Sequence, residues 1–193
     1  DPHSHHPAAP DARFACDLGF LGNRLPDRER RVEDFLLAPA SARPDRRFLL
    51  GGSGWDDKVL PPNVGRLGHV YTHEHNAFNC TALAVLNVSR DSMAHTGYSP
   101  ATRVFEAAGA GACLISDAWE GIACFLEPDR EILVAASGAA VGEHLDALTP
   151  RRARGIGAAA RRRVHAEHTY AHRAGAVERA LTGAPALRSG AAP

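Results

Sequence analysis

The sequence predicts an α/β fold in which a parallel β-sheet is covered by helices on both faces. Short apolar runs typical of strands alternate with amphipathic helical runs through nearly the whole chain. Such alternation is typical of strand–helix–strand units, whose crossover helices cover the sheet. The length of 193 residues fits one domain, or one domain with tails.

The composition argues against several classes of protein. The apolar fraction of 45% is that of an ordinary globular domain, and the formal net charge is zero. A chain without net charge has no overall field that attracts nucleic acid or a membrane surface. No apolar run approaches the roughly 20 residues of a membrane-spanning helix, and no signal peptide is visible.

Four cysteines are scattered along the chain without a Cys-x-x-Cys pair, at Cys16, Cys80, Cys113 and Cys124. Three of them sit in apolar stretches. We therefore expect reduced core thiols in a cytoplasmic protein, rather than disulfides or metal ligands.

The opening segment Asp1–Pro10 contains three prolines and no periodicity, which predicts a linker or tail. His3, His5 and His6 are candidate metal ligands, but nothing in the sequence fixes their geometry, so we expect a solvated linker. The chain does not begin with Met, and we expect it to be a piece of a longer protein.

A strand, a glycine turn and a helix follow in succession. Phe14–Leu21 is the predicted strand, Gly22, Asn23 and Arg24 form the turn, and Asp27 is the expected N-cap of the helix. The unit lacks the full Gly-x-Gly-x-x-Gly pattern, so it is a weak signal for a dinucleotide.

A second predicted strand, Arg47–Leu50, runs into the glycine-rich residues 51–54. A glycine cluster suits either a close approach to a ligand or a simple turn, and both readings stay open. Val64–Val70 and Leu83–Val88 are the next strands, with a short helix within Tyr71–Asn79 between them.

Three histidines near the third strand, His69, His73 and His75, raise the alternative of a zinc site. Their spacing is not that of a ligand set, because His69 would end a strand while the other two would lie on a helix. We expect these side chains at the surface or at the edge of a ligand site.

The rest of the chain is organised around Gly97–Leu126. Ser99 as N-cap and Pro100 as the first helical residue predict where a helix begins, and Gly109 and Gly111 predict where it ends. The start of such a helix presents bare N–H groups above the strand ends, which suits a phosphate.

Cys113–Ile115 is a short predicted strand, and Asp117 is expected to open the loop after it, before a further helix. Glu131–Ala135 is the last predicted strand. The helices that follow include one capped by Thr149, with six arginines within residues 151–163. A basic helix is one means of contacting nucleic acid, but without interleaved aromatic side chains we expect a solvated face.

In a sheet of this kind the loops after the strands converge on one edge, where ligands bind. These loops are Gly22–Arg24, Gly51–Trp55, Val70–Thr72, Arg90–Pro100 and Asp117–Gly121.

Three runs of the sequence resemble a known family. The run TRVFEAAGAGACLISDAWEGIACFLEPDREILVA resembles the donor-binding core of the GT-B glycosyltransferases, and is most similar to the group-1 type found in CgeB-like (spore maturation protein) glycosyltransferases. The runs DLGFLGNRLPDRERRVEDFLLAPA and RRRVHAEHTYAHR resemble the same family. The resemblance extends roughly from Phe14 to Leu181.

The resemblance implies a Rossmann-like nucleotide-sugar-binding domain over residues 14–181, a linker at 1–13 and a flexible tail at 182–193. It implies a second Rossmann-like domain on the N-terminal side that holds the acceptor and is missing here. The chain then corresponds to the C-terminal half of a bacterial-type, hexosyltransferase-like enzyme. No cofactor and no metal ion is implied, because arginines and a helix start supply positive charge and no DxD motif is present.

The resemblance also implies roles for residues. Glu106 grips the ribose of a nucleoside diphosphate sugar, since a carboxylate accepts charge-assisted hydrogen bonds from the 2′ and 3′ hydroxyls. Arg103 and the N–H groups near Ala101 and Thr102 face the diphosphate and offset charge on the leaving group. The full set expected at the donor site is Ser99, Ala101, Thr102, Arg103, Glu106, Glu120, Gly22, Asn23 and Arg24, with His69 and Val70 bordering the base.

One departure from the family concerns the sugar. Related transferases often carry a glutamate eight positions before the ribose glutamate, where it contacts the sugar, and Tyr98 stands there in this chain. The sugar and the retaining outcome therefore do not carry over. Glu120 is a candidate for the sugar side, with capping of the next helix as its alternative.

A purely structural interpretation of these residues and two other functions remain as alternatives. Arg103 and Glu106 lie three apart, and as a surface ion pair they would contribute under ~1 kcal/mol. A non-catalytic nucleotide-binding or assembly module of a surface or spore layer is the alternative function, and a sugar-nucleotide epimerase is a third.

Overall fold

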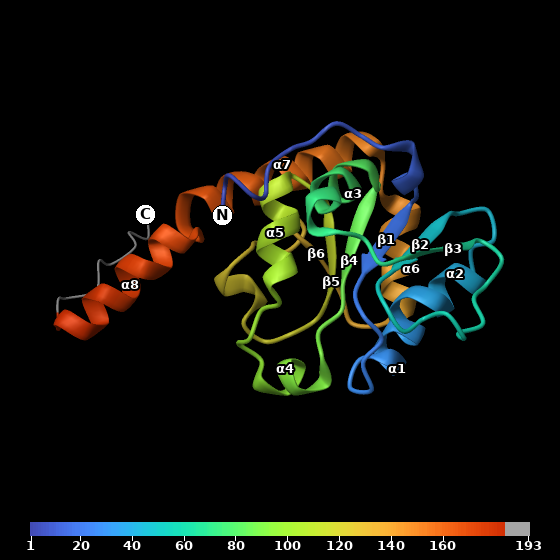
Figure 1. Ribbon diagram of the computed structural model, residues 1–193, viewed down its shortest axis with the longest axis horizontal. Helices are drawn as coiled ribbons and strands as arrows, with labels where there is room; N and C mark the ends of the chain where they lie inside the picture. Colours follow the sequence, from blue (N-terminus) through green and yellow to red (C-terminus); the bar gives the residue numbers. More distant parts are fainter. Residues whose placement is uncertain (184–193) are drawn as a thin grey trace.

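The computed structural model describes residues 1–183 and contains one wholly parallel six-stranded sheet in the order β3-β2-β1-β4-β5-β6 (Figure 1). The predicted fold class is confirmed. Chain order reverses between β1 and β4, which are neighbours, and ligands of such sheets bind beyond the carboxyl ends at that point. The strands are β1 Leu18–Leu21, β2 Phe48–Gly51, β3 Val64–Gly68, β4 Ala84–Asn87, β5 Leu114–Asp117 and β6 Leu133–Ala135.

Helices cover both faces of the sheet (Figure 1). One face is packed by α1, α2 and α6, the other by α3 and α5, and α7 contributes side chains to both apolar clusters. The helices are α1 Glu29–Val32, α2 Ala38–Ser41, α3 His75–Thr81, α4 Asp91–Thr96, α5 Thr102–Ala110, α6 Gly138–Ala147, α7 Pro150–Glu167 and α8 Tyr170–Thr182.

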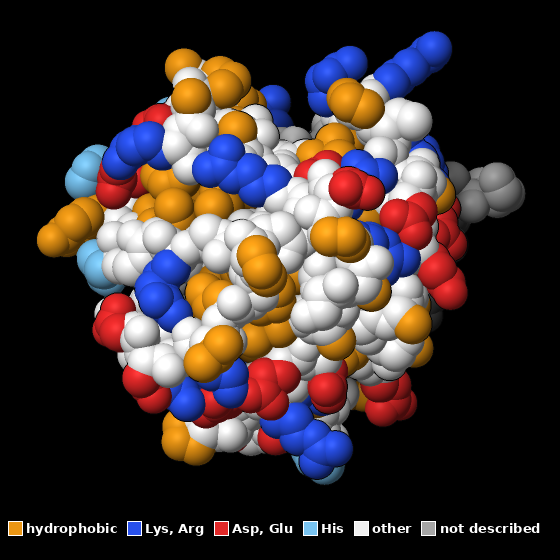
Figure 2. Space-filling model, turned by 90° about the vertical axis from the view of Figure 1, so that its right-hand side faces the viewer, with side chains coloured by type: hydrophobic (Ala, Val, Ile, Leu, Met, Phe, Trp, Pro, Cys, Tyr) orange, Lys and Arg blue, Asp and Glu red, His pale blue; other side chains and the backbone are white. Residues whose placement is uncertain are grey.

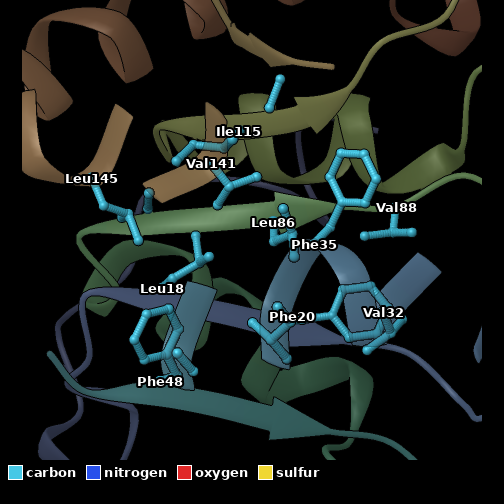
Figure 3. Packing of buried hydrophobic residues seen from close by; sticks show 14 of the residues in the cluster. Leu18, Phe20, Val32, Phe35, Phe48, Leu86, Val88, Ile115, Val141 and Leu145 are labelled. Atoms are coloured by element: carbon cyan, nitrogen blue, oxygen red, sulfur yellow. The ribbon is translucent and has the colours of Figure 1, made fainter. Parts of the chain in front are cut away.

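The larger apolar cluster fills the space between the sheet and the helices of one face (Figure 3). Burying one large aliphatic or aromatic side chain contributes roughly 1.5–3 kcal/mol, so this cluster fixes the sheet against its helices. Its labelled members are Leu18, Phe20, Phe48, Leu86, Val88 and Ile115 from the strands or their ends, and Val32, Phe35, Val141 and Leu145 from the helices.

The first long helix contains a wider π turn, Glu33–Leu37, between α1 and α2. Pro39 lies in the first turn of α2. Because proline has no N–H and its ring clashes with the carbonyl four residues earlier, a regular α-helix cannot run through it, and one π turn absorbs the misfit.

The structure moves the start of α5. The helix begins at Thr102 with Ala101 as its N-cap and without a capping side chain, so the prediction of Ser99 and Pro100 as N-cap and first residue is wrong. α4 ends shortly before, at Thr96, and the next residue, Gly97, adopts a left-handed φ of 74°. The residues between Gly97 and Thr102 are needed to reach the next helix. The predicted end at Gly111 is confirmed by its φ of 83°, whereas Gly109 lies inside the helix.

Other boundaries also shift. Phe14 belongs to a 3₁₀ turn, Ala12–Phe14, so β1 is shorter than predicted, and the residue before α1 is Arg28 rather than Asp27. Only a 3₁₀ turn, Ile122–Cys124, stands where a helix was expected after β5.

Asp117 is the last residue of β5 and is fully buried, so it does not open the loop. A carboxylate is buried only when its oxygens find donors. Asp117 accepts hydrogen bonds from the Ser89 backbone N–H (3.1 Å) and from Arg31 Nη2 (2.5 Å). The sequence pattern could not show these partners, because they come from other elements.

The cysteines are free thiols with unequal burial. Cys113 is buried, Cys16 and Cys80 are half-buried, and Cys124 is exposed, so the expectation of core thiols fails for Cys124. Burial raises the pKa of Cys16 and of Cys113 to about 12.

Both ends of the described chain lie on the same side of the sheet, where α8 projects from the body (Figure 1). The segment before β1 packs against α3 and α5, so it is not a free tail. The predicted frayed tail begins at Thr182 and lies almost wholly outside the described residues. Among residues 1–183, no helix combines the length and apolarity needed to cross a bilayer.

On the face beside the edge strand β3, acidic and basic side chains are interspersed (Figure 2). That mixture provides no continuous positive field on this face for a polyanion.

Candidate functional site

A cleft of about 330 Å³ opens beyond the carboxyl ends of β1, β2 and β3 and beside the start of α5. Arg90, from the loop after β4, also lines the cleft, which therefore includes the junction of β1 and β4 at which the strand order reverses. The residues lining the cleft are Leu21, Gly22, Asn23, Leu25, Arg28, Gly52, His69, Val70, Thr72, His75, Arg90 and Arg103.

Three arginines of the cleft, Arg28, Arg90 and Arg103, form its positive side. Within residues 1–183 none of them makes an ion pair with a carboxylate. Arg28 donates to the carbonyl oxygen of Asn23 at 2.5 Å, and its Nε is buried without a partner in the same part of the chain. The three therefore leave most of their donors for a ligand.

The electrostatics of these arginines follow from burial and mutual repulsion. Burial and the neighbouring charge of Arg28 lower the pKa of Arg103 to about 10, against the opposing effect of Glu106. Burial and the charge of Arg90 likewise lower the pKa of Arg28. Like charges held together in a partly desolvated place are stabilised by an anion between them.

Phe20 at the centre of β1 supports two of the guanidinium groups. The Cζ atoms of Arg103 and Arg28 lie 5.1 Å and 5.5 Å from its ring centroid, within the range of cation–π attraction. A Cβ at Gly22 would meet Phe20 Cζ at 2.8 Å and Arg28 Nη2 at 2.9 Å. Glycine at this turn thus lets the loop approach the ring and the arginine.

Arg24 lies next to these residues, but its guanidinium group forms ion pairs with carboxylates outside the cleft. Its Nη2 pairs with Glu29 at 2.8 Å and its Nη1 with Asp57 at 2.7 Å. Its side chain is absent from the lining of the cleft, which Gly22 and Asn23 do line.

The buried Asp117 fixes the loop that carries Arg90. Its oxygens hold the backbone N–H of Ser89, the residue before Arg90, and also bind the half-buried Arg31 of α1. A charged network below the cleft therefore sets the position of the β4–α4 loop relative to α1.

A second hollow, here called the groove, lies along α5 and has a volume of about 220 Å³. Glu106 lines it, together with Thr102, and neither lines the cleft. The structure thus places Arg103 and Glu106 at different hollows, and it shows no ion pair between them. The rest of the groove comes from the N-terminal segment (Asp1, Pro2, His5), from α5 or just before it (Pro100, Phe105, Gly109), and from α7, α8 and the turn between them (Val164, His165, His168, Thr169, Tyr170, Arg173).

The remaining predicted residues lie near the start of α5 but line neither hollow. Ser99 and Ala101 precede the helix, and no side chain caps it, so its first N–H groups are left for another partner. Glu120 is exposed and accepts a hydrogen bond from the Tyr98 hydroxyl at 3.0 Å. Tyr98, which departs from the family pattern, and Glu120, the candidate for the sugar side, are therefore in contact.

Sequence reasoning missed Arg28 and Arg90. The signal for Arg28 was its place one turn after the Gly22 loop, at the start of the helix. Arg90 carried the weaker signal of a charge shortly after a mostly apolar strand. No group of three or more His, Cys, Asp or Glu side chains suited to a metal occurs within the described part of the chain.

A family model described as glycosyl transferase-like matches residues 28–179, most of the chain. The chain belongs to the glycosyl transferase-like family. Its fold is that of the GT-B glycosyltransferases, which the similar solved structures share. No curated protein sequence matches the chain significantly.

Three solved structures illustrate this likeness. A sucrose-phosphate synthase from Thermosynechococcus elongatus is 18% identical with a TM-score of 0.73, covering 96% of this chain and 51% of its own. The HepE protein of Anabaena, solved in complex with UDP-glucose, is 12% identical with a TM-score of 0.69, covering 95% of this chain and 55% of its own. This glycosyltransferase-like chain thus spans about half the length of these neighbours.

The third structure is the C-terminal domain of a glycosyl transferase group 1 family protein from Francisella tularensis. It is 12% identical with a TM-score of 0.65, covering 88% of this chain and 98% of its own. At these identities the likeness establishes the fold alone.

Proposed function

We propose that this chain is the donor-binding half of a GT-B glycosyltransferase of the CgeB-like type, and that it holds a nucleoside diphosphate sugar. The observation that carries the proposal is the convergence of Arg28, Arg90 and Arg103 on one cleft without a carboxylate partner among residues 1–183. Surplus positive charge at the point where strand order reverses suits a diphosphate.

The proposed donor straddles α5. Its diphosphate contacts Arg103, Arg28, the Gly22–Asn23 loop and the bare N–H groups at the start of the helix. Its ribose hydroxyls donate to Glu106 on the neighbouring face, and His69 and Val70 border the base. Glu106 has room for this role, because no hydrogen bond within residues 1–183 engages its carboxylate.

Transfer of the sugar breaks its bond to the diphosphate, which leaves with extra negative charge. Fixed guanidinium groups and a helix start offset that charge as it develops, because they need no reorganisation in the transition state. We propose that the reaction needs no metal ion for this reason. A hexosyl group is the expected cargo by family resemblance.

Glu120 is proposed to face the sugar. The Tyr98 hydroxyl donates a hydrogen bond to the Glu120 carboxylate at 3.0 Å. Because this hydroxyl is neutral, the carboxylate keeps its negative charge. Tyr98 and Glu120 together are thus proposed to take the place of the single sugar-contacting glutamate of related transferases. The acceptor, and any general base, are proposed to lie on an N-terminal domain outside this sequence, in a cytoplasmic enzyme.

Calorimetric binding of UDP, GDP, dTDP and ADP to this chain and to Glu106→Ala tests the proposal. We expect one nucleotide to bind, and the variant to lose about 1.5–3 kcal/mol of binding free energy, the value of a hydrogen bond to a charged group. Glu143→Ala, an exposed glutamate on α6, is the matched control and should bind like the parent chain. Equal affinities of the parent chain and Glu106→Ala would contradict the ribose assignment.

Tyr98 in place of the family's sugar-contacting glutamate favours one second candidate, a nucleotide-binding module that transfers no sugar. The two candidates differ in the whole protein. If a protein that also contains the acceptor domain binds the nucleotide but neither transfers nor hydrolyses the sugar, the binding module is the better description.

A further inference from the structure

The N-terminal segment, residues 1–11 and here called the strap, is fixed along α3 by three hydrogen bonds. Asn76 Nδ2 donates to the Ser4 carbonyl at 2.8 Å, the Ala8 N–H donates to Cys80 Sγ at 3.3 Å, and the Asp11 N–H donates to Thr81 Oγ1 at 2.9 Å. The partners Asn76, Cys80 and Thr81 all belong to α3. The strap therefore has one defined path over the helical layer beside the cleft.

The strap also contacts α5, at Gly109. A Cβ at this glycine would lie 3.1 Å from the carbonyl oxygen of His5 and 3.3 Å from the Cβ of His5. Gly109 sits in a regular helix, where alanine would ordinarily be more favourable. The close approach of His5, rather than the backbone conformation, is what glycine permits here.

His5 lies beside Glu106. The two residues line the same groove, and Glu106 and Gly109 are three apart on one helix, so they share a face. The Nδ1 atom of His5 is buried without a hydrogen-bond partner in the described chain. An imidazole with an unused nitrogen thus borders a carboxylate with an unused pair of oxygens.

The charges around His5 agree with this geometry. Burial lowers the pKa of His5, the Glu106 carboxylate opposes that shift, and the neighbouring His75 and His6 add to it. The other titratable groups that line the groove are Asp1 of the strap itself and, from α7, α8 and the turn between them, His165, His168, Tyr170 and Arg173.

We propose that the strap is part of the donor site and that His5 is a positioning residue, which holds the Glu106 carboxylate in place for the ribose hydroxyls. The inference rests on the function proposed above, and names a residue on which nucleotide binding depends. A carboxylate bordered by an imidazole whose segment is hydrogen-bonded to α3 samples fewer rotamers, so less conformational entropy is lost when the ligand binds.

Histidine titration by NMR tests the interaction of His5 with the Glu106 carboxylate without any nucleotide. In Glu106→Gln the favourable field of the carboxylate is gone, so the pKa of His5 should fall. Glu143→Gln, on α6, is the control and should leave the pKa of His5 unchanged. An unchanged pKa of His5 in Glu106→Gln would overturn the proposal.

Calorimetry with UDP, GDP, dTDP and ADP then tests the positioning role. His5→Ala should weaken binding of the accepted nucleotide about 3–10-fold, and His3→Ala should leave it unchanged. In the Glu106→Ala background His5→Ala should add no further loss, because it acts through that carboxylate. Gly109→Ala, which keeps His5 but displaces the strap, should reproduce the His5→Ala loss.

The outcomes separate the two proposals. Independent, additive losses from His5→Ala and Glu106→Ala would overturn the positioning role and leave the donor site standing. If no nucleotide binds to the parent chain, the positioning role falls together with the donor site, while the titration still decides whether the Glu106 carboxylate acts on His5.

Discussion

Two groups of arginines in this molecule have opposite surroundings. Arg24, Arg31, Arg43 and Arg163 each bind at least one carboxylate at 2.5–3.1 Å. Arg28, Arg90 and Arg103 meet at the cleft, where they have no carboxylate partner among residues 1–183, and two of them lie against the ring of Phe20 instead.

The difference separates charges that hold the fold from charges that await a ligand. A paired arginine satisfies its donors inside the protein, and breaking the pair leaves a charge unsatisfied. The cleft arginines repel one another and are partly desolvated, as the lowered pKa values of Arg28 and Arg103 record. Such an arrangement lowers stability in the absence of an anion and favours anion binding.

The largest expected effect comes from the buried partner of Arg31. Asp117→Ala removes the acceptor of Arg31 and of the Ser89 N–H, so we expect the free energy of unfolding to fall by about 3 kcal/mol. Urea denaturation followed by circular dichroism measures this. If the free energy of unfolding falls by no more than the value of an exposed ion pair, the hydrogen bonds of Asp117 do not stabilise the fold.

The cleft should respond in the opposite way. Arg103→Gln removes a repelling, partly buried charge, so the free energy of unfolding should stay unchanged or rise. The affinity for the accepted nucleotide should fall roughly 10–100-fold, the value of a hydrogen bond between charged groups. Calorimetry and urea denaturation of the same sample measure both, with Arg152→Gln on the exposed face of α7 as the control. A clear loss of stability would place Arg103 with the structural arginines.

The smallest effect is expected at an exposed pair. Arg43 binds Asp146 at 2.7 Å, but the carboxylate is largely exposed, so Asp146→Ala should hardly move the unfolding midpoint. Arg43 lowers the pKa of Asp146. A carboxyl with a lowered pKa stabilises the fold above its unfolded pKa, near 3.8, and this contribution disappears as the pH falls through the lower, folded value. Parent chain and variant should therefore differ least in acid, and a difference that grows below pH 4 would contradict this.

The sequence by itself determined the fold class, most strands and the loops that meet at one edge of the sheet. Apolar runs and glycine turns follow from local pattern, and the loops after the strands of a parallel sheet must meet at one edge. Gly22, Asn23, His69, Val70 and Arg103, which the family resemblance named for the donor site, line the cleft.

Only the tertiary structure decided which charges are free. Arg24 and Arg28 are four residues apart in the sequence, yet Arg24 is paired with Glu29 and Asp57 while Arg28 faces the cleft. Pairing depends on carboxylates that come from distant elements, as with Arg31 and Asp117, 86 positions apart. The start of α5, the burial of Asp117 and the path of the strap over Gly109 were likewise set by packing between elements, which no local pattern contains.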